Sequence, residues 1–209
     1  MGLCVSVGIL AGLMDVDPEG VELVREELAM VNEVLRKYGL PDHEEPTSLP
    51  KMNNRSGLNG FPYSALHCLR RFYAWRIANP DQIPPPLKEG EKPAYDPVVG
   101  RITSPHHHLL WHSDCEGYYV PIDFPEVLED ESIAGGIVGS SVRLLDELVV
   151  VAAPLKIALH NRKLNDSDAA VIVKEGKKGG PYWLERLVWL NLFEAARLSI
   201  EHRAAIHFG

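Results

Sequence analysis

The sequence predicts an α+β fold, a small and mainly antiparallel sheet covered by about four helices, with long Pro-rich loops. Residues 18–38 and 182–203 carry apolar side chains at steps of three and four, which is typical of amphipathic helices. Short apolar runs near the N-terminus, before and after residue 115, and at 204–208 favour strands. These segments do not alternate in the rhythm of a doubly wound sheet. We therefore expect a single α+β domain over residues 1–209.

The N-terminal segment has two interpretations. Residues 4–10 form an apolar run that we interpret as a buried first strand. Gly2 and Cys4 also match the pattern of an N-myristoylation site with a second acyl position. Because that pattern is short, the strand is the favoured interpretation.

The first helix is predicted over residues 18–38. Asp17 is a suitable N-cap, Pro18 suits the first helical position, and Gly39 followed by Pro41 ends the segment. Acidic side chains lead and basic ones follow on the polar face, as the helix dipole prefers. We expect this helix to pack one face on the core and expose the other to solvent.

Further helices are predicted over residues 63–78, 140–151 and 182–203, with a short one beginning near Asn165. Residues 40–62 are rich in Pro, Asn and Gly and indicate an ordered loop. Residues 79–105 include three consecutive prolines at 84–86 and are expected to be a Pro-rich loop or excursion without regular structure.

Composition limits the classes of function. The chain has 209 residues, 45% hydrophobic and 24% charged, which is ordinary for a globular domain. A net charge of −8 argues against binding of nucleic acid, because phosphate contacts need a positive surface. No segment is long and apolar enough to span a membrane. Three cysteines without a C-x-x-C pair favour a reducing, cytoplasmic compartment.

Residues 106–121 are the first candidate for a polar site. If residues 108–116 are extended, alternate side chains share a face, so that His112, Asp114 and Glu116 lie together with His108. Imidazole and carboxylates at this spacing suit a divalent metal bound by His108 and His112, or a catalytic acid–base group of His112, Asp114 and Glu116. Residues 113–117 are also typical of a hairpin turn, which is the favoured interpretation and breaks that geometry.

The second candidate is the start of the helix over 63–78. His67, Arg70 and Arg71 would form a corner that binds an anion near the helix N-terminus, and we add Tyr118 to these candidate ligand-binding residues. Ion pairing of the arginines with carboxylates is the favoured alternative, because the chain is acidic.

Several segments together resemble a set of short bacterial proteins to which no activity is assigned. The resemblance covers nearly the whole chain and rests on GLPDHEEP at 39–46, GFPYS at 60–64, HSDCEGYYVP at 112–121, GSS at 139–141, ERLVWL at 185–190 and FEAARLSIEH at 193–202. It implies a free-standing bacterial cytosolic domain and transfers no catalytic residue.

Two functions of different class follow from these observations. The first is a soluble, cytoplasmic binding or accessory protein, similar to immunity proteins, whose acidic surface engages a protein partner or a small polar ligand. The second is a metal-assisted or acid–base enzyme of hydrolase type that uses the residues at 112–116. The sequence predicts no certain cofactor, a possible divalent metal, and no nucleic-acid or membrane partner, and it leaves the oligomeric state open.

Overall fold

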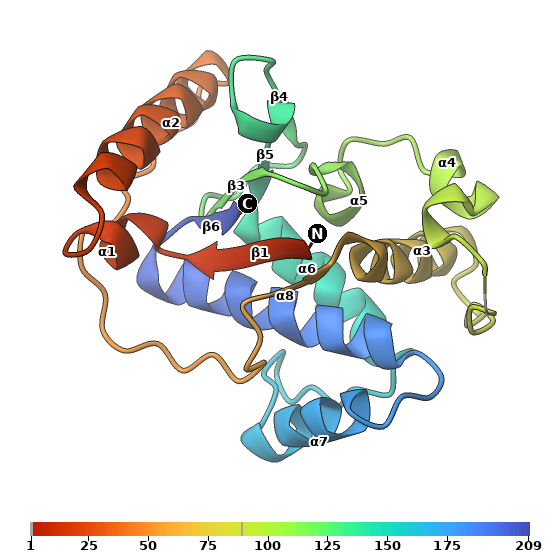
Figure 1. Ribbon diagram of the computed structural model, residues 1–209. Coiled ribbons are helices and arrows are strands. Elements are labelled where there is room, and N and C mark those ends of the chain that lie inside the picture. The colour runs from red at the N-terminus through yellow and green to blue at the C-terminus, as the bar shows by residue number, and fades with distance from the viewer. Residues whose placement is uncertain (1, 89) are drawn as a thin grey trace.

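The computed structural model describes residues 2–88 and 90–209 and confirms the α+β fold (Figure 1). Within these residues one sheet has the strand order β2-β1-β6-β3-β5-β4. Only β3 and β5 are parallel, and the other neighbours are antiparallel, so the sheet is mainly antiparallel as predicted. The strands are β1 Gly2–Val7, β2 Gly60–Pro62, β3 Gly117–Val120, β4 Leu128–Glu129, β5 Ile137–Ser140 and β6 Ile206–Phe208.

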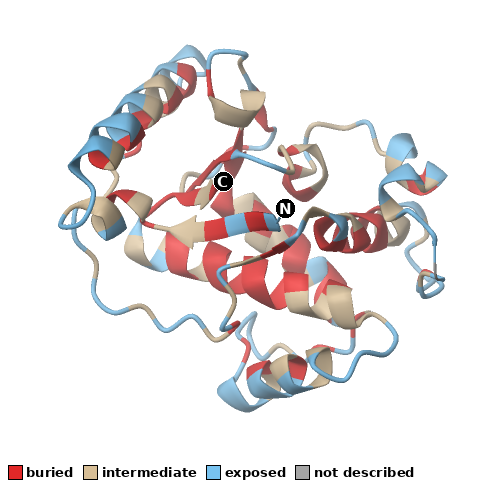
Figure 2. Ribbon diagram, in the orientation of Figure 1, coloured by how far each residue is buried: buried red, intermediate tan, exposed pale blue. Residues whose placement is uncertain are grey.

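Four helices lie on one side of the sheet, and the longest of them is central (Figure 1). They are α3 Tyr63–Ala78, α6 Ser141–Ala152, α7 Asp166–Gly176 and α8 Trp183–His202. The helix α7 packs against α8 on the side away from the strands (Figure 1). The helix α8 packs against the other three and against β1, and Trp189 and Phe193 stack inside this core. Figure 2 shows how completely α8 is buried between its neighbours.

The opposite face of the sheet is covered by α1 Ile9–Leu13 and the long helix α2 Pro18–Lys37. Along β3 the side chains alternate, because successive residues of a strand point to opposite faces. Tyr119 joins the core beneath α8, whereas Tyr118 and Val120 join a second core beneath α2. The inner side of α2 supplies six buried apolar residues and its outer side is exposed (Figure 2).

Most predicted elements are confirmed. The helices occur within two residues of the predicted limits, Asp17 caps α2 by accepting from the N–H of Gly20, and a closing strand follows α8. The first strand is also confirmed, although it ends at Val7 and Ile9 already begins α1. Cys4 lies exposed on β1, and acylation of Gly2 or Cys4 stays a prediction.

Two predictions of local structure are wrong. Residues 79–105 contain the short helix α4 Pro97–Arg101 and a 3₁₀ turn at Pro93–Tyr95, each begun by a proline at a first helical position. The segment predicted as a strand before residue 113 contains the one-turn helix α5 His108–Trp111. The cause is tertiary: the carboxyl group of Glu147 on α6 accepts from the N–H groups of His108 and Leu109, each at 2.7 Å, and so caps this turn.

Among the described residues no helix combines the length and the apolar character needed to cross a membrane.

Candidate functional site: an acidic face on α2 and the β4 turn

The structure does not bring the predicted triad together on one strand face. Because α5 is helical and residues 112–116 turn, His112, Asp114 and Glu116 have three different environments: His112 is buried, Asp114 is partly exposed and Glu116 is exposed. No group of three His, Cys, Asp or Glu residues in the described part of the chain has metal-binding geometry. The roles given to these side chains, and the metal assigned to His108 and His112, stay predictions.

His112 has a packing role. Its ring stacks on Tyr119 with centroids 3.9 Å apart, and its two nitrogens lie 3.0 Å and 3.1 Å from the carbonyl oxygens of Ser113 and Tyr118. Burial lowers the pKa of His112 to about 4. The imidazole is therefore neutral at pH 7 and donates its one N–H to one of the two carbonyl groups.

His108 and Glu147 form a second buried polar group. The Nδ1 atom of His108 accepts from the N–H of Ser140 at 2.9 Å, and burial lowers the pKa of His108 to about 4. Burial raises the pKa of Glu147 to about 8, although the two N–H groups of α5 oppose that shift. These contacts join α5, β5 and α6.

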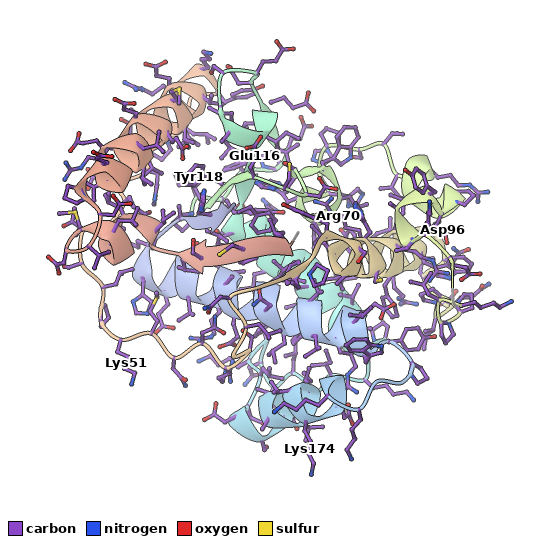
Figure 3. The ribbon with its side chains drawn as sticks, viewed as in Figure 1. Lys51, Arg70, Asp96, Glu116, Tyr118 and Lys174 are labelled. Carbon is purple, nitrogen blue, oxygen red and sulfur yellow. The ribbon has the colours of Figure 1, made fainter. Side chains whose placement is uncertain are left out.

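The predicted anion-binding corner is divided among three partners. His67 lies 2.9 Å from the carboxylate of Asp114, and Arg71 pairs with Asp96 at 2.6 Å. Arg70 is buried, and its guanidinium donates to the carbonyl oxygens of Leu109, His112 and Ser113 (Figure 3). All three side chains connect α3 to neighbouring loops. Arg71 forms an ion pair with a carboxylate, as the favoured alternative for these arginines predicted.

Tyr118, the remaining candidate, is buried under α2, where its hydroxyl donates to the carboxylate of Glu27. Desolvation raises its pKa. The hydrogen bond fastens α2 to the centre of the sheet, and Figure 3 places Tyr118 between α2 and the strands.

The strongest polar feature of the molecule is the distribution of its charge. Residues 15–45 hold ten acidic and three basic residues, a net charge of −7. Residues 114–131 hold seven acidic residues and no basic one. The rest of the chain holds twelve acidic and eighteen basic residues, a net charge of +6. The net negative charge of the protein thus comes from two short segments.

The first acidic segment presents a row of carboxylates on the outer side of α2. Glu19, Glu22, Glu26 and Glu33 are exposed and follow steps of three, four and seven residues, so they share one face of the helix. At 1.5 Å rise per residue the row spans about 21 Å. Glu22 pairs with Arg25, whereas Glu19, Glu26 and Glu33 have no ion pair among the described residues.

The second acidic segment lies beside the C-terminal end of α2 (Figure 1). Lys37 of α2 pairs with Asp130 at 2.5 Å, next to the exposed side chains of Glu129 and Glu131. These three acidic residues line an open hollow of about 690 Å³ together with Trp111. The tertiary structure therefore places the end of the second acidic segment beside α2. We call the α2 row together with residues 129–131 the acidic face.

Three lysines lie far from the acidic face. Lys174, labelled in Figure 3, lies on α7 at the opposite end of the molecule from α2. Lys177 and Lys178 follow on the loop after α7. This end of the molecule also carries Asp166, Asp168 and Glu175, so its charges are mixed, whereas the acidic face is mainly negative.

Sequence reasoning treated the acidic side of α2 as a solvated helix face and missed its participation in a site. The available signal was the charge of each segment, rather than that of the whole chain. Nothing in the sequence predicts that the second segment lies beside α2, because Lys37 and Asp130 are 93 residues apart and come into contact only in the folded chain.

Comparisons with known proteins add one finding. A family model described as "Putative DNA-mimic protein" matches residues 1–208. No curated protein and no solved structure matches the chain.

Proposed function

The chain belongs to the "Putative DNA-mimic protein" family, and from this premise we propose that its acidic face binds the DNA-binding surface of another protein in place of DNA. One observation supports the proposal above others. The carboxylates of α2 and those of residues 129–131, far apart in sequence, lie side by side, because buried residues of α2 pack in one cluster with Leu128 and Lys37 pairs with Asp130.

The family corrects the functions expected from the sequence. An immunity-like partner and a hydrolase at residues 112–116 are both wrong as predictions, because the matching family is described by mimicry of DNA and by neither of those activities. The prediction that nucleic acid has no part in binding is wrong for the same reason, because a protein that mimics DNA binds proteins whose own ligand is DNA. A net charge of −8 argues against binding DNA, but it equally suits a protein that takes the place of DNA.

The spacing of the α2 carboxylates suits this role. Each DNA strand carries one negative charge per 3.4 Å of helix axis, and a DNA-binding surface places Lys and Arg to match such an array. The steps from Glu19 to Glu22 and from Glu22 to Glu26 correspond to about 4.5 Å and 6 Å along α2. The step from Glu26 to Glu33 is about 10.5 Å, so the row is sparser than a DNA strand. It offers single negative charges that the long side chains of lysine and arginine can reach.

The position of the row on a helix adds rigidity. α2 is fixed to the sheet by six buried apolar residues and by the Tyr118–Glu27 hydrogen bond. The backbone positions that carry the carboxylates are therefore fixed before a partner arrives. A preorganised array loses less entropy on binding than a flexible acidic tail would.

The proposal is tested by displacement from DNA. DNA-binding proteins from an extract of the organism that encodes the chain are bound to duplex DNA on cellulose, and the purified protein is added. We expect the added protein to release one of the bound proteins from the DNA, because it occupies the surface with which that protein binds DNA. The variant Glu19→Gln/Glu22→Gln/Glu26→Gln/Glu33→Gln should need roughly tenfold more protein for the same release, because four charges are removed from the interface.

A matched control removes four exposed acidic charges outside the acidic face: Asp81→Asn/Glu91→Gln/Asp166→Asn/Glu201→Gln. This variant has the same net charge as the first and should release the protein as the native chain does. Equal loss in both variants would show that only total charge matters. Absence of release by the native chain would overturn the proposal.

A further inference from the structure

The acidic face also exposes large apolar side chains. Leu23 on α2 is 58% exposed, Tyr38 at the end of the helix is 53% exposed, and Val16 just before it is 75% exposed. In the described chain, seven large hydrophobic residues are between 46% and 80% exposed, and three of them lie on α2 or next to it. A single exposed leucine is common on protein surfaces and does not by itself indicate a binding site. What Leu23 contributes therefore depends on where it lies relative to the charged residues.

Leu23 lies within the row of carboxylates. It follows Glu19 by four residues and precedes Glu26 by three, and residues at these distances are neighbours on a helix surface. Its side chain takes no part in the core beneath α2, which is formed by other residues of the helix, from Val21 to Leu35. The acidic face is thus a mixed surface in which an apolar side chain is bordered by negative charges.

We propose that Leu23 is an apolar anchor for the partner, whose DNA-binding surface carries an apolar side chain between its lysines and arginines. This inference rests on the proposed function and specifies the chemistry of the partner. DNA-binding surfaces use apolar side chains to contact thymine methyl groups or to enter between base steps. Such a group would meet Leu23 while the surrounding cations meet Glu19 and Glu26.

Charge complementarity selects this occupant over a second copy of the chain. A symmetric dimer through α2 would place the same surface of both copies together. Each copy carries a net charge of −7 over residues 15–45, so the two acidic faces repel. A basic partner removes this repulsion and covers Leu23 at the same time.

The two kinds of contact should act on different steps of binding. The exposed carboxylates attract a basic partner over distance and give an association rate that depends on salt. A covered leucine removes apolar surface from water and mainly slows dissociation, with little dependence on salt. Replacement of Leu23 should therefore change mainly the dissociation rate, whereas removal of the carboxylates should change mainly the association rate and its dependence on salt.

The test uses two defined probes: lysine-rich helical peptides of equal charge, one with leucine and one with alanine in the middle of the basic face. Their affinities are measured by fluorescence anisotropy for the native protein, for Leu23→Ala, and for Val171→Ala. Val171 is 46% exposed on α7, away from α2, and serves as the matched control. We expect the native protein and the control to prefer the leucine peptide about fivefold, and Leu23→Ala to lose the preference.

The outcomes separate this inference from the proposed function. If Leu23→Ala keeps the preference, or the native protein shows none, the apolar anchor is refuted while charge-dependent binding of both peptides can persist. If the four-glutamine variant of α2 binds both peptides as the native protein does, the acidic face itself is refuted. Sedimentation of the native protein should show a monomer, and a dimer that Leu23→Ala dissociates would assign the anchor to self-association.

Discussion

At the scale of single residues, the buried polar side chains of this protein act on loops. Arg70 illustrates this. It forms no ion pair with a carboxylate among the described residues, and its guanidinium donates hydrogen bonds to three backbone carbonyl groups. Its planar guanidinium addresses several acceptors at once, which a lysine ammonium on a flexible stem does not reproduce. The segment that carries α5 and the 112–116 turn therefore depends on one side chain of α3.

Replacement of Arg70 by lysine should destabilise the protein. We expect Arg70→Lys to lower the free energy of unfolding by about 2 kcal/mol, because at least two buried carbonyl groups lose their donors. Urea denaturation measures the change. In the control Arg76→Lys the lost contact is a hydrogen bond to the carbonyl of Gln82 at an exposed site, and the midpoint should move little.

The neutral histidines predict a dependence of stability on pH. In the folded protein burial lowers the pKa of His108 and His112 to about 4, below the ordinary value of 6.5. At these two sites the unfolded chain therefore binds more protons between these values, so their contribution to the free energy of unfolding is lost as the pH falls from about 6.5 to about 4. Above pH 6.5 this contribution is fully present. Glu147, with its pKa raised to about 8, contributes in the opposite direction as the pH falls from about 8 to about 4.5.

A variant of one histidine tests this assignment. In His108→Asn the amide oxygen still accepts from the N–H of Ser140, but the side chain no longer titrates. Urea midpoints measured from pH 7 to pH 4.5 should fall less steeply than in the native protein. The exposed His160→Gln should keep the native slope, and a native slope in His108→Asn would refute the assignment.

At the scale of elements, α2 and the β3–β5 pair are the parts on which the acidic face depends. α2 places its row of glutamates outward because its apolar residues face the sheet. β5 pairs in parallel with β3 and antiparallel with β4, and it leads into α6. Because residues 129–131 lie at the end of β4, their position depends on these two pairings. Gly139 permits it, since a Cβ atom there would lie 2.3 Å from the ring of Tyr119.

The variant Gly139→Ala should therefore be destabilised by about 2 kcal/mol, because the added methyl group forces the buried ring of Tyr119 to move. Thermal or urea unfolding provides the measurement. The matched control is Gly12→Ala on α1, where an added Cβ would have no neighbour within 4 Å. That control should be neutral or slightly stabilising, since alanine favours helix.

At the scale of the whole molecule, the separation of charge matters more than its sum. A molecule with a negative end attracts and orients a basic partner before contact. We expect the association rate with a protein released from DNA to fall roughly tenfold or more from low to high salt, while the dissociation rate changes little. The four-glutamine variant of α2 should show a shallower salt dependence in stopped-flow measurements, and an unchanged slope would contradict steering by this row.

The sequence by itself determined the fold class, the long helices and the exposure of the α2 carboxylates. These properties follow from local periodicity and from caps such as Asp17, which act over a few residues. The total charge and the absence of a long apolar helix were also visible without the structure.

Only the tertiary structure decided which polar residues meet. Glu147 converts a strand-like segment into α5 from 38 and 39 residues away, and Lys37 draws the 129–131 turn to α2 across 93 residues. Such pairings depend on the close packing of distant elements, and no local propensity encodes them. For that reason the sequence offered convergence of the residues at 112–116 only as an alternative to a turn, and the acidic face became a single surface only in the folded chain.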